Sequence, residues 1–506
     1  MKVTLISPYS DLQAFGIRTL SACLKQEGHG VQLIFLPRDF TDKFEETVLN
    51  EVVELSRGSG LIGISLMTNF FNNVVQITQR LKEKLRAPIL WGGVHPTIRP
   101  EECLDYADMV CLGEGEETLV ELAGKMKDGL YCHDVQGMWF KDQGRIIANK
   151  MRPLIRDLDS IPFPDYDYET HYILKDNCIQ KMDEHLLKAH MNGIYVTIPS
   201  RGCPFGCTYC CNNTLNKMYS NAKIVRKRNV DNIIKELMEV KSRLPFIKCI
   251  IFGDDAFFIR TVEEIREFCK KYRDNVGLPL SIGGATPSTI IREKLSLLVD
   301  AGLIFLRMGI QTGSERTKKL YKRYHSNTQV EEAVKIINEF KDKIRIPHYD
   351  IIIDNPWETD EDLIETLMFL AKLPTPYQLT LYSLVFYPGT ELYEMAKRDG
   401  IITGCLKDIY RQYYHDCKAT YLNSLFFLLH EYASRGDKIS TKMMFLLTNR
   451  KLSQLKLNRL LYYILKTQNL LYKGFKAIQK GDWARIIRYI RGSSGIAVHN
   501  YNHGTD

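Results

Sequence analysis

The sequence predicts an α/β protein with a Rossmann-like N-terminal domain, a (β/α)6 partial barrel and a helical C-terminal region. Short β-rich runs alternate with amphipathic helical patterns along two stretches of the chain, which is typical of parallel, doubly wound sheets. Beyond about Gly400 the strand pattern disappears and helical patterns dominate. We therefore expect domains at residues 1–150 and 191–400, a linker at 151–190 and a basic helical region at 401–506.

The N-terminal domain is predicted from five strands and the helices between them. The strands are expected at Val3–Ser7, Val31–Phe35, Leu61–Ser65, Pro88–Trp91 and Met109–Leu112. The helices are expected at Ile17–Glu27, Phe44–Leu55, Val74–Leu85 and Glu116–Lys127. Val135–Lys150 is typical of a β-hairpin. The proline-containing, charged segment that follows predicts the linker.

The barrel is predicted from six further strands. They are expected at Tyr195–Pro199, Cys249–Phe252, Leu280–Gly283, Ile304–Gly309, Tyr349–Asp354 and Leu379–Phe386. The intervening helices are expected at Asn229–Arg243, Val262–Tyr272, Ser288–Asp300, Thr328–Phe340 and Asp360–Leu373. In parallel folds of this kind the chemistry gathers at the carboxyl ends of the strands.

Composition and charge limit the class of protein. The chain has 13 cysteines and no secretory signal pattern, which predicts reduced thiols and a cytoplasmic location. No apolar stretch approaches the roughly 18–20 residues that span a bilayer. The net charge is +8, and residues 437–506 hold 13 Lys and Arg against 3 Asp and Glu. The positive excess therefore belongs to the C-terminal tail.

Three cysteines follow the first barrel strand with C-x3-C-x2-C spacing, at Cys203, Cys207 and Cys210. Three thiolates on one tight loop hold three irons of a 4Fe–4S cluster and leave the fourth iron without a protein ligand. Gly202 and Gly206 suit such a folded loop. A zinc knuckle or unrelated core cysteines are the alternatives, although structural zinc favours paired C-x2-C elements or a Cys/His quartet.

This spacing, with aromatic Tyr209 before the last cysteine, resembles the signature of the radical S-adenosylmethionine (SAM) superfamily. The resemblance implies that the open iron chelates the amino and carboxylate groups of SAM and that Tyr209 lies near the cofactor. Three further strand ends resemble motifs of the same family. We expect their cofactor contacts at Gly253, Asp254 and Asp255, at Gln311, Thr312 and Ser314, and at Pro356.

The acidic motif at Gly253, Asp254 and Asp255 has a second interpretation, because Asp-rich turns also cap helices. The second motif departs from the family pattern as well. Gln311 stands where the family has glutamate, so the hydrogen bond there changes type.

The N-terminal domain resembles the cobalamin-binding domain that precedes the barrel in one large radical SAM class. The resemblance rests on small and polar residues at strand ends, and it implies a slot for cobalamin lined by Ser65, Gly92, Gly93, Gly113 and Glu114. Gln13 stands where the classical domain has the histidine that ligates cobalt. Bound cobalamin is therefore expected to lack a histidine ligand, and His95 is more simply a structural residue. A Rossmann-like module with another ligand or none is the alternative.

The basic tail interleaves Lys and Arg with Leu, Tyr and Ile. Such a helix packs its apolar face on a core, which is the commoner arrangement, or lies on an anionic membrane surface. Peripheral membrane association therefore stays open, and with it a lipid-like substrate. No nucleic-acid recognition motif accompanies the charge, so nucleic acid is not expected as a partner.

Together these features predict a cobalamin-dependent radical SAM enzyme. The resemblance implies that a 4Fe–4S cluster, SAM and cobalamin generate a 5′-deoxyadenosyl radical and supply a methyl group for an unactivated carbon. A reductant such as flavodoxin or ferredoxin is the expected partner, together with a small-molecule or lipid-like substrate. The alternatives are radical cyclisation or rearrangement without methylation, and a non-catalytic iron–sulfur or cobalamin sensor.

Overall fold

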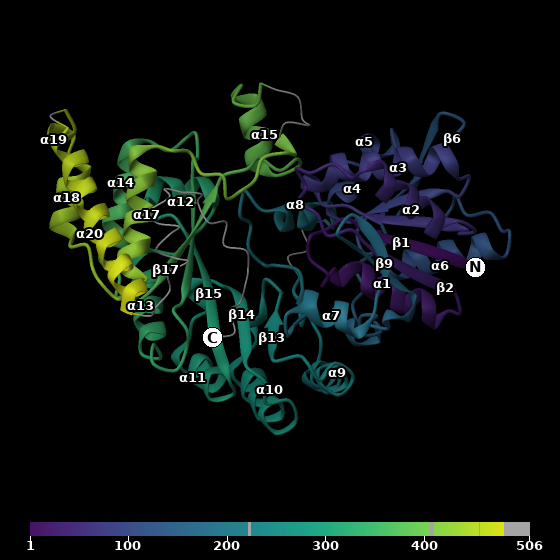
Figure 1. The fold of residues 1–506 in the computed structure, drawn as a ribbon, viewed down its shortest axis with the longest axis horizontal. Helices are drawn as coiled ribbons and strands as arrows, with labels where there is room; N and C mark the ends of the chain where they lie inside the picture. The colour runs from purple at the N-terminus through teal and green to yellow at the C-terminus, as the bar shows by residue number, and fades with distance from the viewer. Residues whose placement is uncertain (221–223, 404–408, 455, 480–506) are drawn as a thin grey trace. The chain divides into compact units, whose positions relative to one another are not determined.

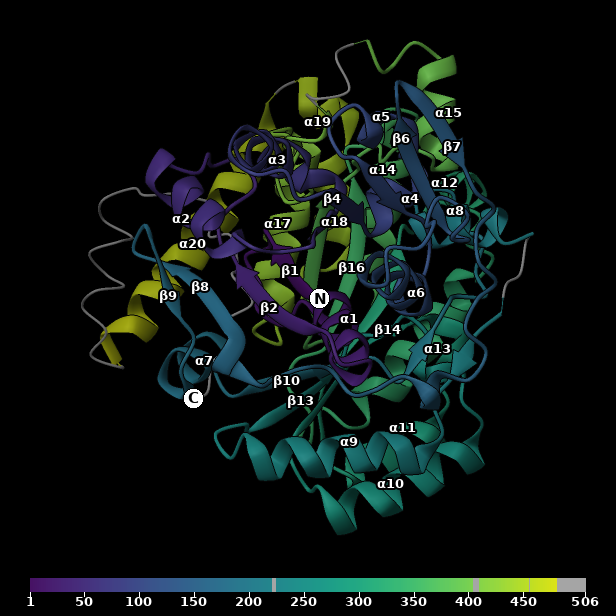
Figure 2. The same cartoon turned by 90° about the vertical axis from the view of Figure 1, so that its right-hand side faces the viewer.

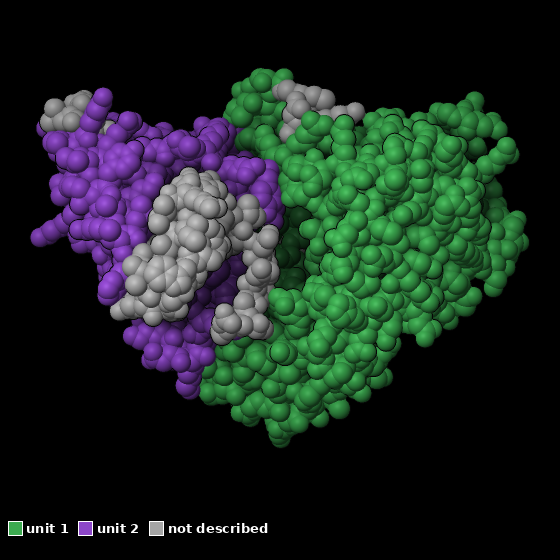
Figure 3. Space-filling view, in the orientation of Figure 1, with its two compact units in different colours: residues 1–285, 293–304, 385–412 green, residues 286–292, 305–384, 413–506 purple. Residues whose placement is uncertain are grey.

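A computed structural model describes residues 1–220, 224–403, 409–454 and 456–479. The chain folds into two compact units, coloured separately in Figure 3. The first unit comprises residues 1–285, 293–304 and 385–412, and the second comprises residues 286–292, 305–384 and 413–506. The predicted domain boundaries do not coincide with this division, because the first half of the barrel belongs to the same unit as the N-terminal domain.

The N-terminal domain, in which Figure 1 labels β1, β2, β6 and β9, is built on a nine-stranded sheet with the order β7-β6-β5-β4-β3-β1-β2-β8-β9. Its five parallel inner strands confirm the predicted ones: β1 (Lys2–Ser7), β2 (Gly30–Phe35), β3 (Leu61–Ser65), β4 (Ile89–Gly92) and β5 (Met109–Cys111). The predicted helices form as α1 (Phe15–Gln26), α2 (Glu46–Ser56), α3 (Phe71–Lys84) and α6 (Glu116–Lys127). Short helices α4 (Val94–Ile98) and α5 (Pro100–Leu104) follow β4. The apolar residues of the inner strands are buried and form the core.

The edges of this sheet show where the sequence prediction was right and where it was wrong. The predicted hairpin forms as β6 (Met138–Asp142) and β7 (Arg145–Ala148). The predicted linker, in contrast, contains β8 (His171–Lys175), β9 (Cys178–Lys181) and helix α7 (Glu184–Met191). Strand β8 pairs in parallel with β2, and its Ile173 is fully buried. Only one short buried run lies among many charged and proline residues, so the alternation was too weak to predict a strand.

The barrel strands form one six-stranded sheet with the order β10-β13-β14-β15-β16-β17. The bounds are β10 (Ile194–Thr197), β13 (Cys249–Phe252), β14 (Leu280–Ala285), β15 (Leu303–Gln311), β16 (His348–Ile353) and β17 (Gln378–Ser383). The helices are α8 (Cys211–Met218), α9 (Val230–Arg243), α10 (Val262–Asn275), α11 (Arg292–Asp300), α12 (Glu315–Tyr321), α13 (Asn327–Asn338), α14 (Asp360–Leu370) and α15 (Glu391–Arg398). Helices α9 and α10 pack side by side beneath the first strands (Figure 2). The predicted (β/α)6 architecture is confirmed.

The C-terminal region of the second unit is helical, as predicted. Its helices are α17 (Tyr421–Ala433), α18 (Thr441–Thr448), α19 (Arg450–Gln454) and α20 (Leu457–Gln479). No helix among the described residues is both long enough and apolar enough to cross a membrane. The rest of the predicted basic region, residues 480–506, lies outside the described part of the chain.

Candidate functional site

The cysteine loop connects β10 to α8 and is closed at its base by a small antiparallel pair. Strand β11 (Ser200–Arg201) pairs there with β12 (Arg226–Lys227). Gly202 has a φ of 94°, and a side chain at this position would run into the carbonyl oxygen of Ile224. The Cys210 amide donates to the Cys207 carbonyl oxygen at 3.2 Å, which makes the turn before α8 tight. Glycine is therefore required at the entrance of the loop.

The three thiols share this loop but are not arranged as a metal site. Cys207 is buried, and Cys203 and Cys210 are half-buried. Burial raises the pKa of Cys203 to about 12, so its thiol is protonated near neutral pH. In residues 1–220, 224–403, 409–454 and 456–479, no group of three His, Cys, Asp or Glu side chains is placed to hold a metal ion. Cluster binding would therefore require the thiols to deprotonate and converge.

The chemistry of the donor set nevertheless fits an iron–sulfur cluster with one open iron. Cysteine thiolates are the ligands that such clusters use, and three of them lie within eight residues of one loop. A fourth cysteine, Cys211, begins α8, and its hydrogen bond to Cys210 raises the pKa of Cys210. The loop is also anchored to α8, since Asn216 Nδ2 donates to the Cys203 carbonyl oxygen at 2.9 Å.

Asp254 is a buried carboxylate with one unused oxygen. It follows β13 and is 5% exposed. The hydroxyl of Ser200, in strand β11, donates to Asp254 Oδ2. Asp254 Oδ1 is buried without a hydrogen-bond partner. Burial raises the pKa of Asp254 to about 7. An unpaired buried oxygen is costly, so this group is poised to accept a hydrogen bond from a ligand.

The helix-cap interpretation of the acidic motif is wrong. The short helix after it, Phe257–Ile259, begins at Ala256 without a side-chain cap, and Thr261 caps α10. Asp255 is instead exposed and accepts a hydrogen bond from Asn212 Nδ2 of α8 at 2.7 Å. Gly253 is exposed beside Asp254. The acidic motif therefore contacts Ser200 at the start of the cysteine loop through Asp254, and α8 directly after the loop through Asp255.

Glu114 is an ion-pair centre, and its expected contact with a cofactor remains a prediction. Its carboxylate accepts two hydrogen bonds from the Arg226 guanidinium, both at 2.8 Å, and one from Arg201 Nη1 at 3.2 Å. The Ile155 amide donates to it at 2.8 Å. Burial alone would raise the pKa of Glu114, but Arg226 and Arg201 outweigh burial and hold it below its usual value. The N-terminal domain is thereby tied to the base of the cysteine loop.

We expect Glu114→Ala to lower the free energy of unfolding by about 2–3 kcal/mol at pH 7, because Arg226 is 9% exposed and would lose its carboxylate. The contribution of Glu114 is present above its unfolded pKa and is lost as pH falls through the lower folded pKa. Urea denaturation at pH 7 and at acidic pH measures both effects. Glu121→Ala removes a more exposed partner of Arg152 and should cost less than about 0.5 kcal/mol. Equal losses for the two variants would contradict the role of Glu114.

Gln13 also joins the N-terminal domain to the barrel. Its side-chain amide donates to the Ile194 carbonyl oxygen of β10 at 3.1 Å. Its oxygen accepts from the Val196 amide at 3.3 Å and from the Tyr166 hydroxyl at 3.1 Å. Both ends of the side chain are therefore hydrogen-bonded within the protein, and a contact between Gln13 and the cofactor remains a prediction.

The remaining predicted slot residues lie at the strand ends of the N-terminal sheet. Ser65 shares a hydrogen bond with the Tyr9 hydroxyl at 2.8 Å. Gly93 has a φ of 112°, and a side chain there would lie 2.9 Å from the Leu66 carbonyl oxygen, so Gly92 and Gly93 pass close to that backbone. A side chain at Gly113 would instead run into the Tyr219 hydroxyl. The Tyr219 hydroxyl therefore lies directly against Gly113, and the expected cofactor contact there remains a prediction.

His95 is structural, as expected. It is 1% exposed, and its ring packs against Phe71 and Tyr410. Burial lowers the pKa of His95 to about 4. The ring is therefore neutral at physiological pH and is enclosed by protein.

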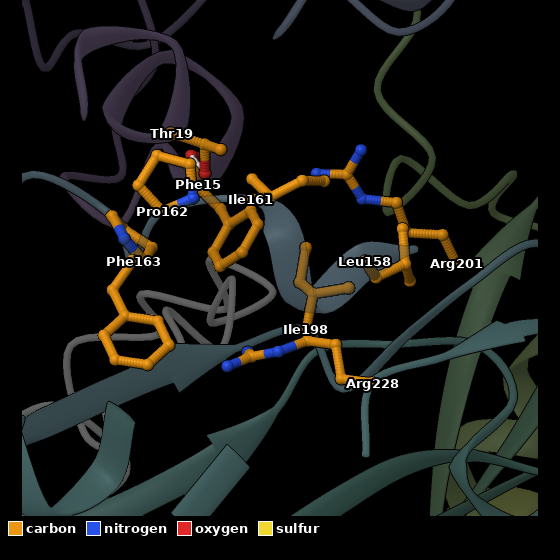
Figure 4. Close-up of a pocket in the computed structure, with 10 residues that line it drawn as sticks. Phe15, Thr19, Leu158, Ile161, Pro162, Phe163, Ile198, Arg201 and Arg228 are labelled. Atoms are coloured by element: carbon orange, nitrogen blue, oxygen red, sulfur yellow. Dashed lines mark hydrogen bonds between the residues drawn. The ribbon is translucent and has the colours of Figure 1, made fainter. Parts of the chain in front are cut away.

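A cleft of about 310 Å³ lies beside Gly113. It is lined by residues that follow β4 and β5, by the β6–β7 hairpin and by the end of α8: Thr97, Ile98, Pro100, Glu101, Leu112, Trp139, Asn149, Met151 and Met218. This volume is in the range of small-ligand sites. A second gap, between α1 and the 158–164 segment next to Arg201 and Arg228, measures only about 20 Å³ (Figure 4). That gap is large enough for a single water.

The motif after β15 belongs to the second unit and is largely structural. Thr312 and Ser314 are 1% and 0% exposed. The Thr312 hydroxyl lies 3.1 Å from that of Thr366, and Ser314 Oγ donates to Asp362 at 2.7 Å. Their hydroxyls are therefore hydrogen-bonded to α14, and the expected cofactor contacts at these two residues remain a prediction. Gln311 is half-buried with a φ of 73°, and Pro356 is exposed.

Comparison with known proteins agrees with both halves of the architecture. Residues 197–370 match the Radical SAM superfamily, and residues 1–123 match the B12 binding domain. The uncharacterized methyltransferase PH0819 of Pyrococcus horikoshii is 26% identical over 400 residues, which cover 76% of this chain and 79% of that protein. The anaerobic magnesium-protoporphyrin IX monomethyl ester cyclase of Synechocystis sp. is 23% identical and aligns over 78% of this chain and 75% of its own.

A solved structure shows the same fold. TsrM from Kitasatospora setae, a radical SAM methyltransferase with cobalamin and a 4Fe–4S cluster bound, superposes with a TM-score of 0.62 at 18% identity. The match covers 80% of this chain and 76% of TsrM. The two matched domains and their order define a radical SAM enzyme with a cobalamin domain. The chain belongs to the B12-binding radical SAM proteins, whose cofactors are a 4Fe–4S cluster, SAM and cobalamin.

Proposed function

We propose that this enzyme cleaves SAM reductively and transfers a methyl group to an unactivated carbon of a small-molecule substrate. The observation that carries the proposal is the direct connection between the cobalamin domain and the cysteine loop within one compact unit. Glu114 holds Arg201 and Arg226 at the base of the loop, and Gln13 holds the strand that leads into it. These hydrogen bonds would therefore fix the relative positions of the cofactors that the two domains bind.

In this proposal Cys203, Cys207 and Cys210 hold the cluster, and Tyr209 lies near SAM. When bound there, the cluster would supply the electron that cleaves SAM, and cobalamin would supply the methyl-transfer chemistry. The unpaired oxygen of Asp254 accepts a hydrogen bond from the ammonium group of SAM, which also favours the ionised carboxylate. Gly253, Asp255, Gln311 and Pro356 are proposed as flanking contacts.

Cobalamin is proposed to bind at the strand ends near Ser65, Gly92 and Gly93, with the 310 Å³ cleft beside them open to part of the ligand. Neither Gln13 nor His95 is available to ligate cobalt, because the first is hydrogen-bonded at both ends and the second is enclosed. Cobalt would therefore lack a ligand from either residue. A cytoplasmic location and a low-potential reductant, such as flavodoxin or ferredoxin, complete the proposal.

Radical cyclisation without methylation is the second candidate, because a cyclase is among the relatives that span most of the chain. The two reactions differ in what they make from SAM. We expect the reconstituted protein, given dithionite, SAM and hydroxocobalamin, to form 5′-deoxyadenosine and S-adenosylhomocysteine, the latter in proportion to bound cobalamin. Formation of 5′-deoxyadenosine alone would favour cyclisation or rearrangement. Absence of both products would favour a non-catalytic sensor.

A further inference from the structure

Helix α20 has an inner face that packs on the rest of the C-terminal region. Asn458 and Asn469 are buried on that face, and Leu465 is half-buried between them. The Tyr432 hydroxyl of α17 donates to the Leu465 carbonyl oxygen at 3.1 Å, and the Tyr421 hydroxyl donates to that of Asn458 at 3.2 Å. Asn469 also donates to Glu431 of α17. The helix is therefore docked on α17, beside α18 (Figure 1).

The opposite side of the same helix exposes large apolar side chains. We call these residues the outer stripe: Leu457, Leu460, Ile464, Leu471 and Phe475, which are 43%, 57%, 47%, 69% and 58% exposed. They follow one another at intervals of three, four, seven and four residues, so at about 3.6 residues per turn they lie along one side of the helix. A helix that only covered a core would turn such residues inward. The expectation that the tail simply packs its apolar face is therefore incomplete.

The charge around the outer stripe is uniformly positive. Leu457–Gln479 contains no Asp or Glu, and Arg459 and Lys466 of this helix and the preceding Lys456 are exposed. Exposed Tyr463, 60% exposed, adds an aromatic ring of the kind that favours a membrane–water interface. A second copy of this helix would bring like charges together, whereas an anionic lipid surface offers the opposite charge.

We propose that the outer stripe of α20 docks on an anionic membrane surface, with the helix lying in the plane of the interface. Apolar side chains enter the boundary between headgroups and acyl chains, and the basic side chains contact acidic headgroups. This proposal does not depend on the cofactor chemistry, because the apoprotein carries the same surface. Binding of this kind weakens as salt screens the charges.

Co-sedimentation of the full chain with vesicles tests the proposal. The vesicles contain phosphatidylcholine alone or phosphatidylcholine with about 30% phosphatidylglycerol, a content that supplies a negative surface potential. We expect binding to the anionic vesicles that falls as sodium chloride is raised. The triple variant Leu460→Gln, Ile464→Gln and Leu471→Gln keeps the charge but should weaken binding at least about tenfold.

A matched variant controls for the loss of exposed apolar surface elsewhere. Leu130→Gln, Tyr131→Gln and Ile146→Gln replace three side chains that are also exposed, and binding should be unchanged. The proposal is overturned if the wild-type protein ignores anionic vesicles, if it binds neutral vesicles equally well, or if the α20 triple variant still binds. It is also overturned if sedimentation shows a wild-type dimer that this variant alone dissociates, because a second copy would then cover the stripe.

Discussion

Replacing Cys203, Cys207 or Cys210 with alanine is expected to reduce SAM cleavage to below about 1% of wild type, because the cofactor performs the electron transfer and the protein cannot replace it. Each variant should also lose the visible absorbance of the cluster and most of its bound iron, since three thiolates are the full protein ligand set of an open-iron cluster. Anaerobic reconstitution followed by a 5′-deoxyadenosine assay, a visible absorbance spectrum and an iron assay measures all three effects.

Cys211→Ala is the matched control for these variants. Cys211 adjoins Cys210 at the start of α8 but lies outside the three-cysteine spacing. The Cys211→Ala protein should keep its cluster and at least about half of its activity, because Cys211 is half-buried and is not one of the three predicted cluster ligands. Loss of the cluster in Cys211→Ala alone, or SAM cleavage by a cluster-free Cys203→Ala protein, would contradict the assignment.

Asp254→Asn is expected to make the protein more stable and less active. The folded-state pKa of Asp254 is about 7, above the roughly 3.9 of an unfolded aspartate, so wild-type stability falls as pH rises between these values. At pH 8 the variant should be more stable by more than about 1 kcal/mol, and near pH 4 the two proteins should be alike. Losing the charged acceptor should weaken SAM binding about 10–100-fold.

Urea denaturation of the apoprotein at pH 4 and pH 8 measures the stability change, and equilibrium dialysis with SAM measures the binding change. Asp255→Asn is the control, because Asp255 is exposed and should shift stability by less than about 0.5 kcal/mol. If Asp254→Asn is less stable than wild type at pH 8, the charge on Asp254 is stabilised by the folded protein and the predicted gain in stability is wrong. Unchanged SAM affinity would remove Asp254 from the proposed site.

The sequence predicted the repeating architecture well, because buried parallel strands and amphipathic helices leave strong local patterns. The bounds of β3 and β13 agree with those expected, and α6 begins and ends where predicted. The β8–β9 hairpin was missed because its buried run is short and the surrounding residues are polar. Local periodicity does not predict a strand such as β8, because its position depends on pairing with β2, which lies far away in the sequence.

The site was predicted less completely, because its connections join residues far apart in the sequence. The motif containing Glu114 was found, but its pairing with Arg226 spans 112 residues and leaves no local signal. Thr312 and Ser314 matched a cofactor motif, yet their hydroxyls bond to α14. Ser200, which holds the buried Asp254, was not singled out at all. Its position directly before the cysteine loop was the one available signal.

The most direct test of the central claim is to measure the metal, sulfide and cobalamin content of the full chain after anaerobic reconstitution. If the N-terminal domain binds cobalamin and the cysteine loop binds a 4Fe–4S cluster, each chain should hold about four irons, about four sulfides and one cobalamin. SAM cleavage should then depend on the cluster. Stoichiometric zinc in place of iron, or a reduced iron–sulfur protein that binds no cobalamin and leaves SAM intact, would contradict the account.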